Sequence, residues 1–325
     1  MAKILITGIT GFIGRAVLTN IVDLGHDITA LVRPGTPESR YQEFGSRIKV
    51  DFMSLSDIRA LKLYLADKSF DLILHIGALR GGRRANRDEY YRSNVGSTEQ
   101  FVDFCLKHNA KLVFCSSVGV FGAIPSELPA NNQSPKNPDN YYHFTKIESE
   151  KIIGKAVLHN LKAMIIRPSI TYGKGDKGFP YQLVKMIDHY HFPLIKKRIW
   201  LHLCHIDALV AAFRWAVDHD FDKAITLNVA DREPVQLSAL VDFISRQLHG
   251  KNYPRFLSID RVFFSLGEKI AHFLRSEIFI SRFELISKSW FYDVQDYYAL
   301  MQQEGIQPHF TIPELQSVID YYKER

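Results

Sequence analysis

The chain has 325 residues, enough for a large hydrophobic core, and its 46% hydrophobic and 23% charged content is ordinary for a globular protein. No apolar run reaches the ~18 residues that a membrane span needs, so we expect none. The net charge of +6 slightly favours an anionic small molecule as ligand and does not by itself indicate nucleic-acid binding.

The cysteines also bear on where the protein works. Cys105, Cys115 and Cys204 lie far apart in apolar surroundings, without the spacing of a metal site. Such thiols are typical of a reducing compartment, and the chain begins with strand-like residues rather than with the layout of a signal peptide. We therefore expect a cytoplasmic protein.

Apolar runs alternate with amphipathic segments along the first 230 residues. The first strand is expected at residues 4–6, followed by a glycine turn and a helix whose apolar positions reach Leu24, with Gly25 as its cap. Further strands are expected at residues 26–33, 47–51, 71–76, 111–117, 161–168 and 224–229, and helices at 56–66, 90–108 and 141–160. This alternation predicts an α/β fold with a Rossmann-type, doubly wound parallel sheet.

The alternation loosens after residue 169, which indicates a second, smaller part. We expect a dinucleotide-binding Rossmann domain at residues 1–169 plus about 201–230, and a discontinuous substrate lobe at 170–200 and 231–325. Residues 261–275 form an amphipathic segment, for which a lid helix packed on its own domain is preferred to a membrane-surface or partner-facing helix.

The glycine turn after the first strand carries the first functional signal. Thr7, Gly8, Gly11 and Gly14 separate an apolar strand from an amphipathic helix. Glycines allow the backbone to approach a pyrophosphate, and the helix N-terminus offers unpaired N–H groups and the positive end of a dipole. A plain surface turn is the alternative, but the strand before and the helix after favour a dinucleotide site.

A second constellation follows the fifth expected strand. Tyr142 and Lys146 are spaced i and i+4, so they share one face of the expected helix. A lysine cation near a phenol favours the phenolate and lowers its pKa, which suits proton transfer. Ser116 and Ser117 come at the carboxyl end of the fifth strand, the edge at which open α/β sheets bind ligands. Ser117 is thus placed to bond a substrate oxygen beside Tyr142.

Several motifs together resemble the extended short-chain dehydrogenase/reductases, the NAD-dependent epimerase/dehydratase family. The matching segments are TGITGFIG (7–14), DLILHIGA (71–78), RSNVGST (92–98), VFCSSVGVFG (113–122), YHFTK (142–146), RPSITYGKGD (167–176) and HIDAL (205–209). They occur in the family's order over about residues 1–230. The resemblance implies a catalytic triad of Ser117, Tyr142 and Lys146: Tyr142 exchanges the proton, Ser117 orients the substrate oxygen, and Lys146 tunes Tyr142 and binds the nicotinamide ribose.

The resemblance also implies which residues hold the cofactor. Asn94 matches a structural asparagine, Asp51 a residue that contacts adenine, and residues 168–170 a segment beside the nicotinamide. The complete set of implied cofactor-binding residues is Thr7, Gly8, Thr10, Gly11, Phe12, Ile13, Gly14, Arg33, Asp51, Phe52, Ile76, Gly77, Ala78, Ser116, Tyr142, Lys146, Pro168, Ser169 and Ile170.

The end of the second expected strand bears on the choice between NAD and NADP. Arg33 lies 19 residues after Gly14, where an acidic residue would bond the ribose 2′-hydroxyl of NAD. A guanidinium instead matches the 2′-phosphate of NADP, and Arg40 is a candidate second contact. We therefore expect NADP(H) as the cofactor, with NAD(H) as the alternative. In the alternative, Arg33 is a solvent-facing residue that only stacks on the adenine.

The substrate is less clearly indicated. Nucleotide-sugar enzymes of this family carry an arginine shortly before the segment that HIDAL matches, but Leu201 occupies that position, and Ala208 replaces the second aspartate. Lys196, Lys197 and Arg198 lie nearby, in what we interpret as a solvated loop. The stretch 167–178 and the tail resemble hydroxysteroid dehydrogenases and dihydroflavonol-type reductases, which transfer a hydride to or from a ketone/alcohol pair.

Two other features were weighed for function. Residues 80–87 (RGGRRANR) carry four arginines at the expected mouth of the active site. A solvated loop is the preferred interpretation, and a clamp for an anionic substrate is the alternative. His189, His191, His202 and His205 have no matching carboxylate cluster, so we expect structural or surface roles for them and no metal site.

The sequence thus predicts an NADP(H)-dependent oxidoreductase for a small-molecule ketone or secondary alcohol, with Tyr142 as acid and base. One alternative is a nucleotide-sugar epimerase or dehydratase with tightly bound NAD(P), and another is a non-catalytic, NADP-sensing protein. The helices at 90–108 and 141–159 resemble those that pair in family dimers, which implies a homodimer.

Overall fold

The computed structural model describes residues 1–80, 86–259 and 284–325. Two compact units share these residues, and each is described by itself. The first unit comprises Met1–Val120, Asn140–Pro168 and Leu209–Leu227, and the second comprises Phe121–Asp139, Ser169–Ala208 and Asn228–Arg325. The expected lid helix at 261–275 lies outside the described residues. The functional division into a cofactor domain and a substrate lobe stays a prediction.

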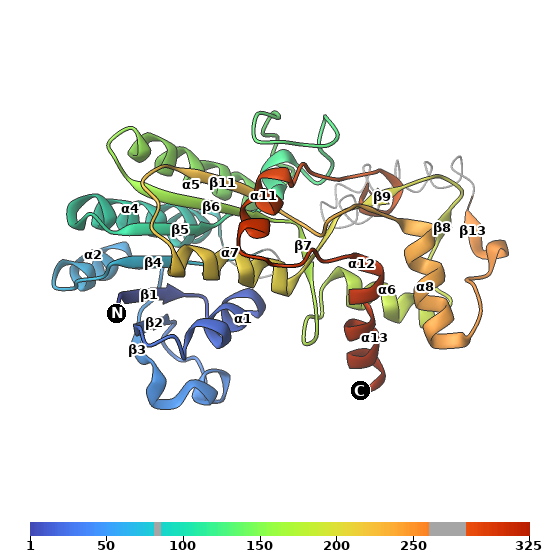
Figure 1. The fold of residues 1–325 in the computed structure, drawn as a ribbon, viewed down its shortest axis with the longest axis horizontal. Helices are drawn as coiled ribbons and strands as arrows, with labels where there is room; N and C mark the ends of the chain where they lie inside the picture. The colour runs from blue at the N-terminus through green and yellow to red at the C-terminus, as the bar shows by residue number, and fades with distance from the viewer. Residues whose placement is uncertain (81–85, 260–283) are drawn as a thin grey trace. The chain divides into compact units, whose positions relative to one another are not determined.

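A parallel sheet organises the first unit, as predicted (Figure 1). Within the described residues it has seven strands in the order β11-β6-β5-β4-β1-β2-β3, so the chain winds outward in both directions from β1 and β4. Its strands are β1 (Lys3–Thr7), β2 (Asp27–Val32), β3 (Lys49–Phe52), β4 (Leu72–His75), β5 (Lys111–Cys115), β6 (Lys162–Pro168) and β11 (Ile225–Val229). The point between β1 and β4, where the winding reverses, is the usual ligand site of such sheets.

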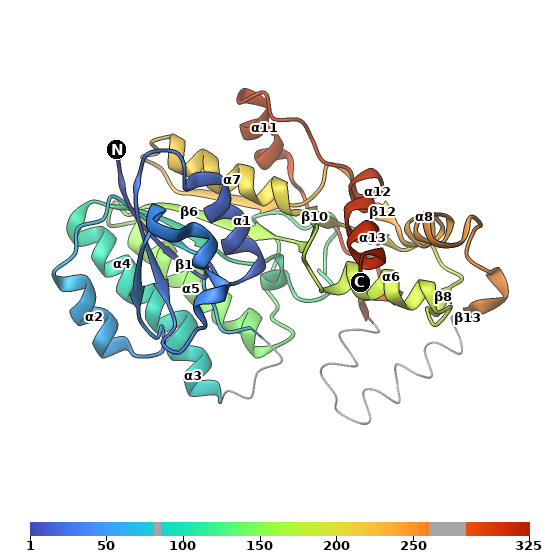
Figure 2. The same cartoon turned by 90° about the horizontal axis from the view of Figure 1, so that it is seen from below.

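Helices cover both faces of this sheet. One face carries α2 (Ile58–Ala66), α4 (Ser97–His108) and α5 (Tyr141–Val157), and the opposite face carries α1 (Phe12–Ile21) and α7 (Ile206–Asp218) (Figure 2). The side chain of Arg214 on α7 donates to the carbonyl of Asn20 on α1, at 3.4 Å. The short elements of this unit are η1 (Glu38–Arg40), η2 (Gln42–Arg47), α3 (Arg87–Tyr91), η3 (Arg92–Gly96) and η4 (Val118–Phe121).

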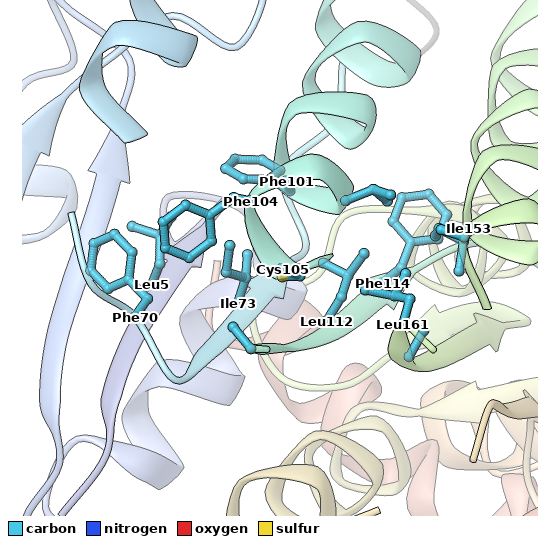
Figure 3. Packing of buried hydrophobic residues seen from close by; sticks show 14 of the residues in the cluster. Leu5, Phe70, Ile73, Phe101, Phe104, Cys105, Leu112, Phe114, Ile153 and Leu161 are labelled. Carbon is cyan, nitrogen blue, oxygen red and sulfur yellow. The ribbon is translucent and has the colours of Figure 1, made fainter. Parts of the chain in front are cut away.

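The core of the first unit lies between the sheet and α2, α4 and α5 (Figure 3). Leu5, Ile73 and Leu112 come from three neighbouring strands, and Phe101 and Ile153 from two of the helices; all five are fully buried. Strands buried on both faces read as continuous apolar runs, and this pattern is what made them predictable. Their burial holds the carboxyl ends of the strands in fixed positions.

The expected helix at 90–108 is interrupted in the structure. The chain forms α3, then the π-helical turn η3, and then α4. Asn94 lies in the π turn, where its amide exchanges two hydrogen bonds with the backbone of Leu79 and donates to the hydroxyl of Thr145 at 2.9 Å. Widened turns of this kind often mark functional positions. Helix α1 is also shorter than expected, because it ends at Ile21 and Gly25 lies beyond it.

The second unit contains small strand pairs and helices. Strand β10 (Leu203–His205) pairs with β7 (Ile170–Tyr172), β12 (Val235–Gln236) with β9 (Trp200–Leu201), and β13 (Ser258–Ile259) with β8 (Leu194–Ile195). Its described helices are α6 (Phe179–Asp188), α8 (Leu237–His249), η5 (Arg255–Leu257), α11 (Gln295–Gln303), α12 (Thr311–Glu314) and α13 (Gln316–Lys323). Throughout the described part of the chain, no helix has the length and apolar character to cross a membrane.

Candidate active site

The glycine turn between β1 and α1 has no room for side chains. Gly8 has a φ of 83°, and a Cβ there would lie 2.6 Å from the backbone nitrogen of Gly77. A Cβ on Gly14 would lie 2.2 Å from the carbonyl oxygen of Gly8. Helix α1 begins after Gly11, and no side chain caps its N-terminus. The first N–H groups of α1 therefore remain available for an anion, and the turn fits a pyrophosphate.

Hydrogen bonds tie β1 to β4 at the winding reversal. The Thr7 hydroxyl accepts the N–H of Gly77 at 2.9 Å and lies 3.0 Å from Nδ1 of His75. Burial of His75 lowers its pKa to about 3, so the imidazole is neutral. The expected cofactor residues Ile76 and Ala78 flank Gly77 in the same segment. The structure thus brings the residues expected at the two sides of the dinucleotide site together.

The two arginines that the sequence proposed for the 2′-phosphate of NADP both lie between β2 and β3. Arg33 directly follows β2 and is exposed. Arg40 belongs to η1, yet its Nη2 atom donates to the carbonyl of Thr10 in the glycine turn, at 2.6 Å. A second guanidinium is therefore anchored at the turn itself. From sequence alone, its loop position gave only a candidate contact.

At the end of β3, Asp51 is already engaged within the protein. Its carboxylate accepts hydrogen bonds from the Tyr64 hydroxyl at 2.8 Å and from Lys68 at 3.1 Å. Burial is the largest single effect and opposes ionisation, but these two bonds together with the charges of Lys68 and Lys49 outweigh it and lower the pKa of Asp51. The next residue, Phe52, is 53% exposed and packs edge-on against Tyr41. An exposed aromatic ring here offers a surface on which a base can stack.

The proposed acid–base pair lies on α5. The Asn140 side chain caps this helix by accepting the N–H of His143. Tyr142 and Lys146 share a face, with the Lys146 ammonium 5.7 Å from the centroid of the Tyr142 ring. That ammonium donates to the carbonyl of Cys115, at the end of β5, at 2.6 Å. Burial lowers the pKa of Lys146 to about 8.

The expectation that Lys146 lowers the pKa of Tyr142 is not met in this structure. Burial dominates and raises the pKa of Tyr142 to about 12, while the Arg80 guanidinium acts in the opposite direction and Cys115 adds to the rise. Lys146 itself is directed to the Cys115 carbonyl. Among the described residues, the cation that favours the phenolate is Arg80, for whose segment the sequence favoured a solvated loop. Residues 81–85 of that segment lie outside the described part.

The two serines after β5 have different roles. Ser117 accepts the N–H of Gly119 at its hydroxyl, at 3.0 Å. Ser116 is buried and donates to Oε1 of Glu150 at 2.6 Å, so its hydroxyl is turned into the protein. Glu150 is also paired with Arg167 of β6 through two bonds of 2.8 Å. This buried network fixes the end of β5, directly before Ser117.

Sequence reasoning missed Glu150 and Arg167. Glu150 follows Lys146 by four residues, so the same helix-face argument that paired Tyr142 with Lys146 points to it. Nothing in the sequence assigns Arg167 as its partner, because the two residues meet only when β6 pairs with β5. A buried bidentate carboxylate–guanidinium pair requires the fold.

The last expected cofactor segment falls at the boundary between the units. Pro168 ends β6 in the first unit, and Ser169 and Ile170 belong to the second. The Ser169 hydroxyl donates to the carbonyl of His202, and Ile170 pairs with Leu203 in the β7–β10 ladder. The Ser169 hydroxyl is thus already used inside its own unit.

The four histidines weighed in the sequence have separate surroundings. His189 and His191 stack on each other near the end of α6. His202 is buried; its Nε2 lies 2.8 Å from the Asp231 carbonyl, and its Nδ1 accepts the N–H of Tyr292. These contacts agree with structural roles. His205 lies beside two residues from the C-terminal segment that the sequence had not connected with it.

A doubly wound parallel sheet with a glycine cradle where the winding reverses defines a dinucleotide-binding Rossmann fold. The model of the NAD dependent epimerase/dehydratase family matches residues 4–230, and the chain belongs to this family. The family resemblance inferred from the motifs is confirmed.

Relatives with different activities match the chain. It is 29% identical over 212 residues to UDP-glucose 4-epimerase of Caenorhabditis elegans, covering 57% of this chain and 60% of that protein. It is 30% identical over 180 residues to 2-alkyl-3-oxoalkanoate reductase of Stenotrophomonas maltophilia, covering 54% of this chain and 52% of that protein. The chain therefore spans little more than half the length of these relatives. UDP-glucuronic acid 4-epimerase of Bacillus cereus, solved with NAD, shares the fold with a TM-score of 0.71 at 19% identity over 99% of both chains.

Proposed function

We propose that the protein is an NADP(H)-dependent oxidoreductase that interconverts a ketone and a secondary alcohol. The observation that carries the proposal is the placement of Tyr142 and Lys146 on one face of α5, with Lys146 bonded to the end of β5 just before Ser117. This is the carboxyl edge of the sheet, where the glycine cradle also lies. An acid–base group and a dinucleotide site thus belong to one edge of the first unit.

The residues present fit a dinucleotide. Gly8 and Gly14 let the turn pack closely against the backbone of Gly77 and against itself, and the N-terminus of α1 lacks a side-chain cap. Residues of this turn would hold the pyrophosphate, and Phe52 and Asp51 lie where the adenine is expected. Arg33 and Arg40 support a 2′-phosphate contact, because the guanidinium fork matches phosphate oxygens.

A thermal-shift titration tests the cofactor. A ligand that binds only the folded protein stabilises it by RT ln(1 + [L]/Kd), so the tighter ligand raises the melting temperature more, and NADPH should raise it more than NADH at equal concentration. Arg33→Ala should reduce the difference, whereas Arg15→Ala, which removes an exposed arginine of α1 paired with Glu43, should leave it unchanged. A larger shift with NADH would contradict the choice of NADP.

The chain's own groups divide the proton chemistry. When bound, the nicotinamide cofactor supplies or accepts a hydride. Tyr142 donates its phenolic proton to the substrate oxygen in the reducing direction and takes it back in the oxidising direction. Ser117 holds that oxygen in place through its hydroxyl. Arg80 supplies positive charge that favours the phenolate, and the Lys146 ammonium lies 5.7 Å from the centroid of the Tyr142 ring.

The position expected to bind a nucleotide diphosphate supports a different substrate class. Leu201, which replaces the family's arginine, is fully buried and pairs with Val235 between β9 and β12. Ala208 is also fully buried. Neither residue offers a charge to a diphosphate. A ketone without a nucleotide group is the class that these residues favour, and the reductase of Stenotrophomonas maltophilia is a relative with a carbonyl substrate in its name.

A nucleotide-sugar epimerase is the second candidate, because UDP-glucose 4-epimerases of several organisms are among the relatives. The two activities differ in cofactor balance. A reductase consumes one NADPH for each ketone reduced, whereas an epimerase returns the hydride and changes the sugar without net cofactor turnover. Product analysis with ketones and with UDP-sugars, combined with absorbance of NADPH, separates them.

Replacement of Tyr142 tests the catalytic assignment. Tyr142→Phe should lower kcat by about a hundredfold or more, since positioned acid–base groups contribute that much, while NADPH binding stays unchanged. Tyr141→Phe is the matched control, because it removes the hydroxyl of the neighbouring tyrosine, whose ring stacks on Phe144. Full activity of Tyr142→Phe would refute the assignment. If both the wild type and Tyr142→Phe bind NADPH but neither turns over a carbonyl substrate, the NADP-sensing alternative is favoured.

A homodimer through α4 and α5, and a cytoplasmic location, belong to the same proposal. Leu106 on α4 and Leu158 directly after α5 are exposed apolar side chains on these helices, as an interface requires. The three cysteines are all buried, which agrees with thiols kept in a reducing compartment.

A further inference from the structure

Three potential metal ligands meet in the second unit, outside the proposed catalytic residues. His205 ends β10, His309 precedes α12, and Glu314 ends α12. One ligand atom from each lies within 4.8 Å of the other two. Nε2 of His205 is 3.9 Å from one carboxylate oxygen of Glu314, and Nδ1 of His309 is 2.9 Å from the other. His205 lies 104 positions before His309 and 109 before Glu314, and the fold brings it next to both.

The fold holds these residues by means of a buried carboxylate. Asp231 accepts the N–H of His205 at 2.7 Å and the Tyr172 hydroxyl at 2.7 Å, and it also accepts the Thr311 hydroxyl. It therefore joins the end of β10 to the start of α12. The carbonyl of His309 accepts the N–H of Arg232 at 2.8 Å, which fixes the segment before α12. The backbones that carry the three ligands are thereby held together without a metal.

We propose that His205, His309 and Glu314 bind one divalent transition-metal ion, with Zn²⁺ as the preferred ion and water in the fourth position. Two imidazole nitrogens and one carboxylate oxygen are a donor set that suits Zn²⁺ and its neighbours, whereas Mg²⁺ and Ca²⁺ prefer oxygen ligands. Zinc bonds of about 2.0–2.1 Å in a tetrahedron place ligand atoms roughly 3.4 Å apart. The separations of 2.9 and 3.9 Å are to the two different carboxylate oxygens of Glu314, and the three ligand atoms lie within 4.8 Å of one another, so binding requires side-chain rotations that bring them to this spacing.

The charges around the cluster also favour a cation. Glu314 and Asp207 contribute two carboxylates at the surface, and Asp231 lies beneath. Oδ2 of Asp207 is 3.7 Å from Nδ1 of His205, the nitrogen that faces away from Glu314. The backbone N–H of Asp207 donates to the same Nδ1 at 3.4 Å, so this nitrogen is held on the side away from Glu314. The metal-free alternative is a local hydrogen bond between His309 and Glu314, and it predicts no saturable metal binding.

Calorimetry with Zn²⁺ distinguishes the two interpretations. The full-length protein, freed of any histidine tag and treated with a chelator, is titrated with ZnCl₂. One Zn²⁺ per chain should bind, and His309→Ala and Glu314→Gln should each weaken binding at least about tenfold. His159→Ala is the matched control, because it removes an exposed histidine in the first unit and should leave binding unchanged. No turnover is measured, so the result is independent of the proposed activity.

Two further readouts protect the conclusion from misfolded variants. Metal-free wild type and variants should have similar circular-dichroism spectra, and Zn²⁺ should raise the melting temperature of the wild type but not of Glu314→Gln, which keeps the size of the side chain. Co²⁺ should give the visible absorption bands of a tetrahedral site in the wild type only. Absence of saturable binding, or equal binding by wild type and both variants, would overturn the proposal.

Discussion

Among the described residues of the arginine-rich segment, Arg80 acts electrostatically on the proposed catalytic pair. Its guanidinium lowers the pKa values of Tyr142, Lys146 and Cys115. Burial has a larger effect on each group: it raises the pKa values of Tyr142 and Cys115 and lowers that of Lys146. Its backbone is held by the hydroxyl of Tyr90, which donates to the Arg80 carbonyl at 2.8 Å. Because the backbone of Arg80 is held in this way, its guanidinium can act electrostatically on Tyr142 and on an anionic substrate.

Replacement of Arg80 should shift the pH dependence of the reaction. In the oxidising direction Tyr142 must be ionised, so kcat/KM rises with pH until the pKa of Tyr142 is reached. Arg80→Gln removes a cation that favours the phenolate, so the alkaline rise should move to higher pH. Because Arg80 is exposed and its charge is screened, we expect a move of about one pH unit or less.

Arg87→Gln provides the control for this profile. Arg87 belongs to the same segment, but its guanidinium lies over the ring of Tyr141 at 5.3 Å. It is not among the groups that shift the pKa of Tyr142. Its variant should keep the wild-type profile. If both variants shifted the profile equally, a general effect of net charge would explain the result, and the specific role of Arg80 would be refuted.

At the scale of elements, the sequence predicted the sheet because its strands are short apolar runs between turn signals. Gly8 and Ser117 follow the ends of β1 and β5, as the sequence predicted, and the chemistry assigned to these ends stays a prediction. It did not predict the π turn, because Asn94 widens the helix only through bonds to Leu79 and Thr145, which come from other elements. Contacts between distant segments are not encoded in local periodicity.

The same limit explains the residues that were missed. Lys146 was expected to lower the pKa of Tyr142 because they are neighbours on a helix, but burial of the phenol between packed elements has the larger effect, and the Lys146 ammonium donates to the Cys115 carbonyl of β5. His205 was separated from Glu314 by 109 residues, so no spacing rule for metal ligands applied. Both findings depend on strand pairing and on the return of the C-terminal segment to β10.

The buried pair that joins α5 to β6 leads to a stability prediction. Glu150 and Arg167 have side chains only 2% and 5% exposed. Glu150→Gln would leave the guanidinium buried without its counter-charge, which typically costs about 3–5 kcal/mol in the free energy of unfolding. Urea denaturation measures this loss. The double variant Glu150→Met with Arg167→Met should be more stable than Glu150→Gln, because no unpaired charge remains.

Glu148→Gln is the control for Glu150→Gln. Glu148 lies on the same helix and pairs with Lys151, whose side chain is 60% exposed. Pairs at the surface contribute about 0–1 kcal/mol, so this variant should unfold close to the wild type. Equal losses in Glu148→Gln and Glu150→Gln would show that the buried pair has no special importance for the link between α5 and the sheet.

On the scale of the whole molecule, each compact unit has a buried neutral histidine. Burial lowers the pKa of His75 in the first unit to about 3 and that of His202 in the second to about 4. In the unfolded chain both titrate near ~6.5. As the pH falls below that value the unfolded state gains protons that the folded state does not bind, so stability is lost from about pH 6.5 downward. The two units should therefore weaken in acid together.

Urea unfolding at pH 7.5 and pH 5.0 checks this expectation. Each buried histidine should contribute a loss of about 2 kcal/mol at pH 5.0, since 1.5 pH units below the unfolded pKa correspond to that free energy. His75→Asn keeps a polar group near the Thr7 hydroxyl but does not titrate. Between the two pH values its free energy of unfolding should therefore fall by about 2 kcal/mol less than that of the wild type. His159→Ala, an exposed control, should keep the full loss. An identical pH dependence in the wild type and His75→Asn would mean that the sensitivity to acid arises elsewhere, and that the β1–β4 junction does not limit stability in acid.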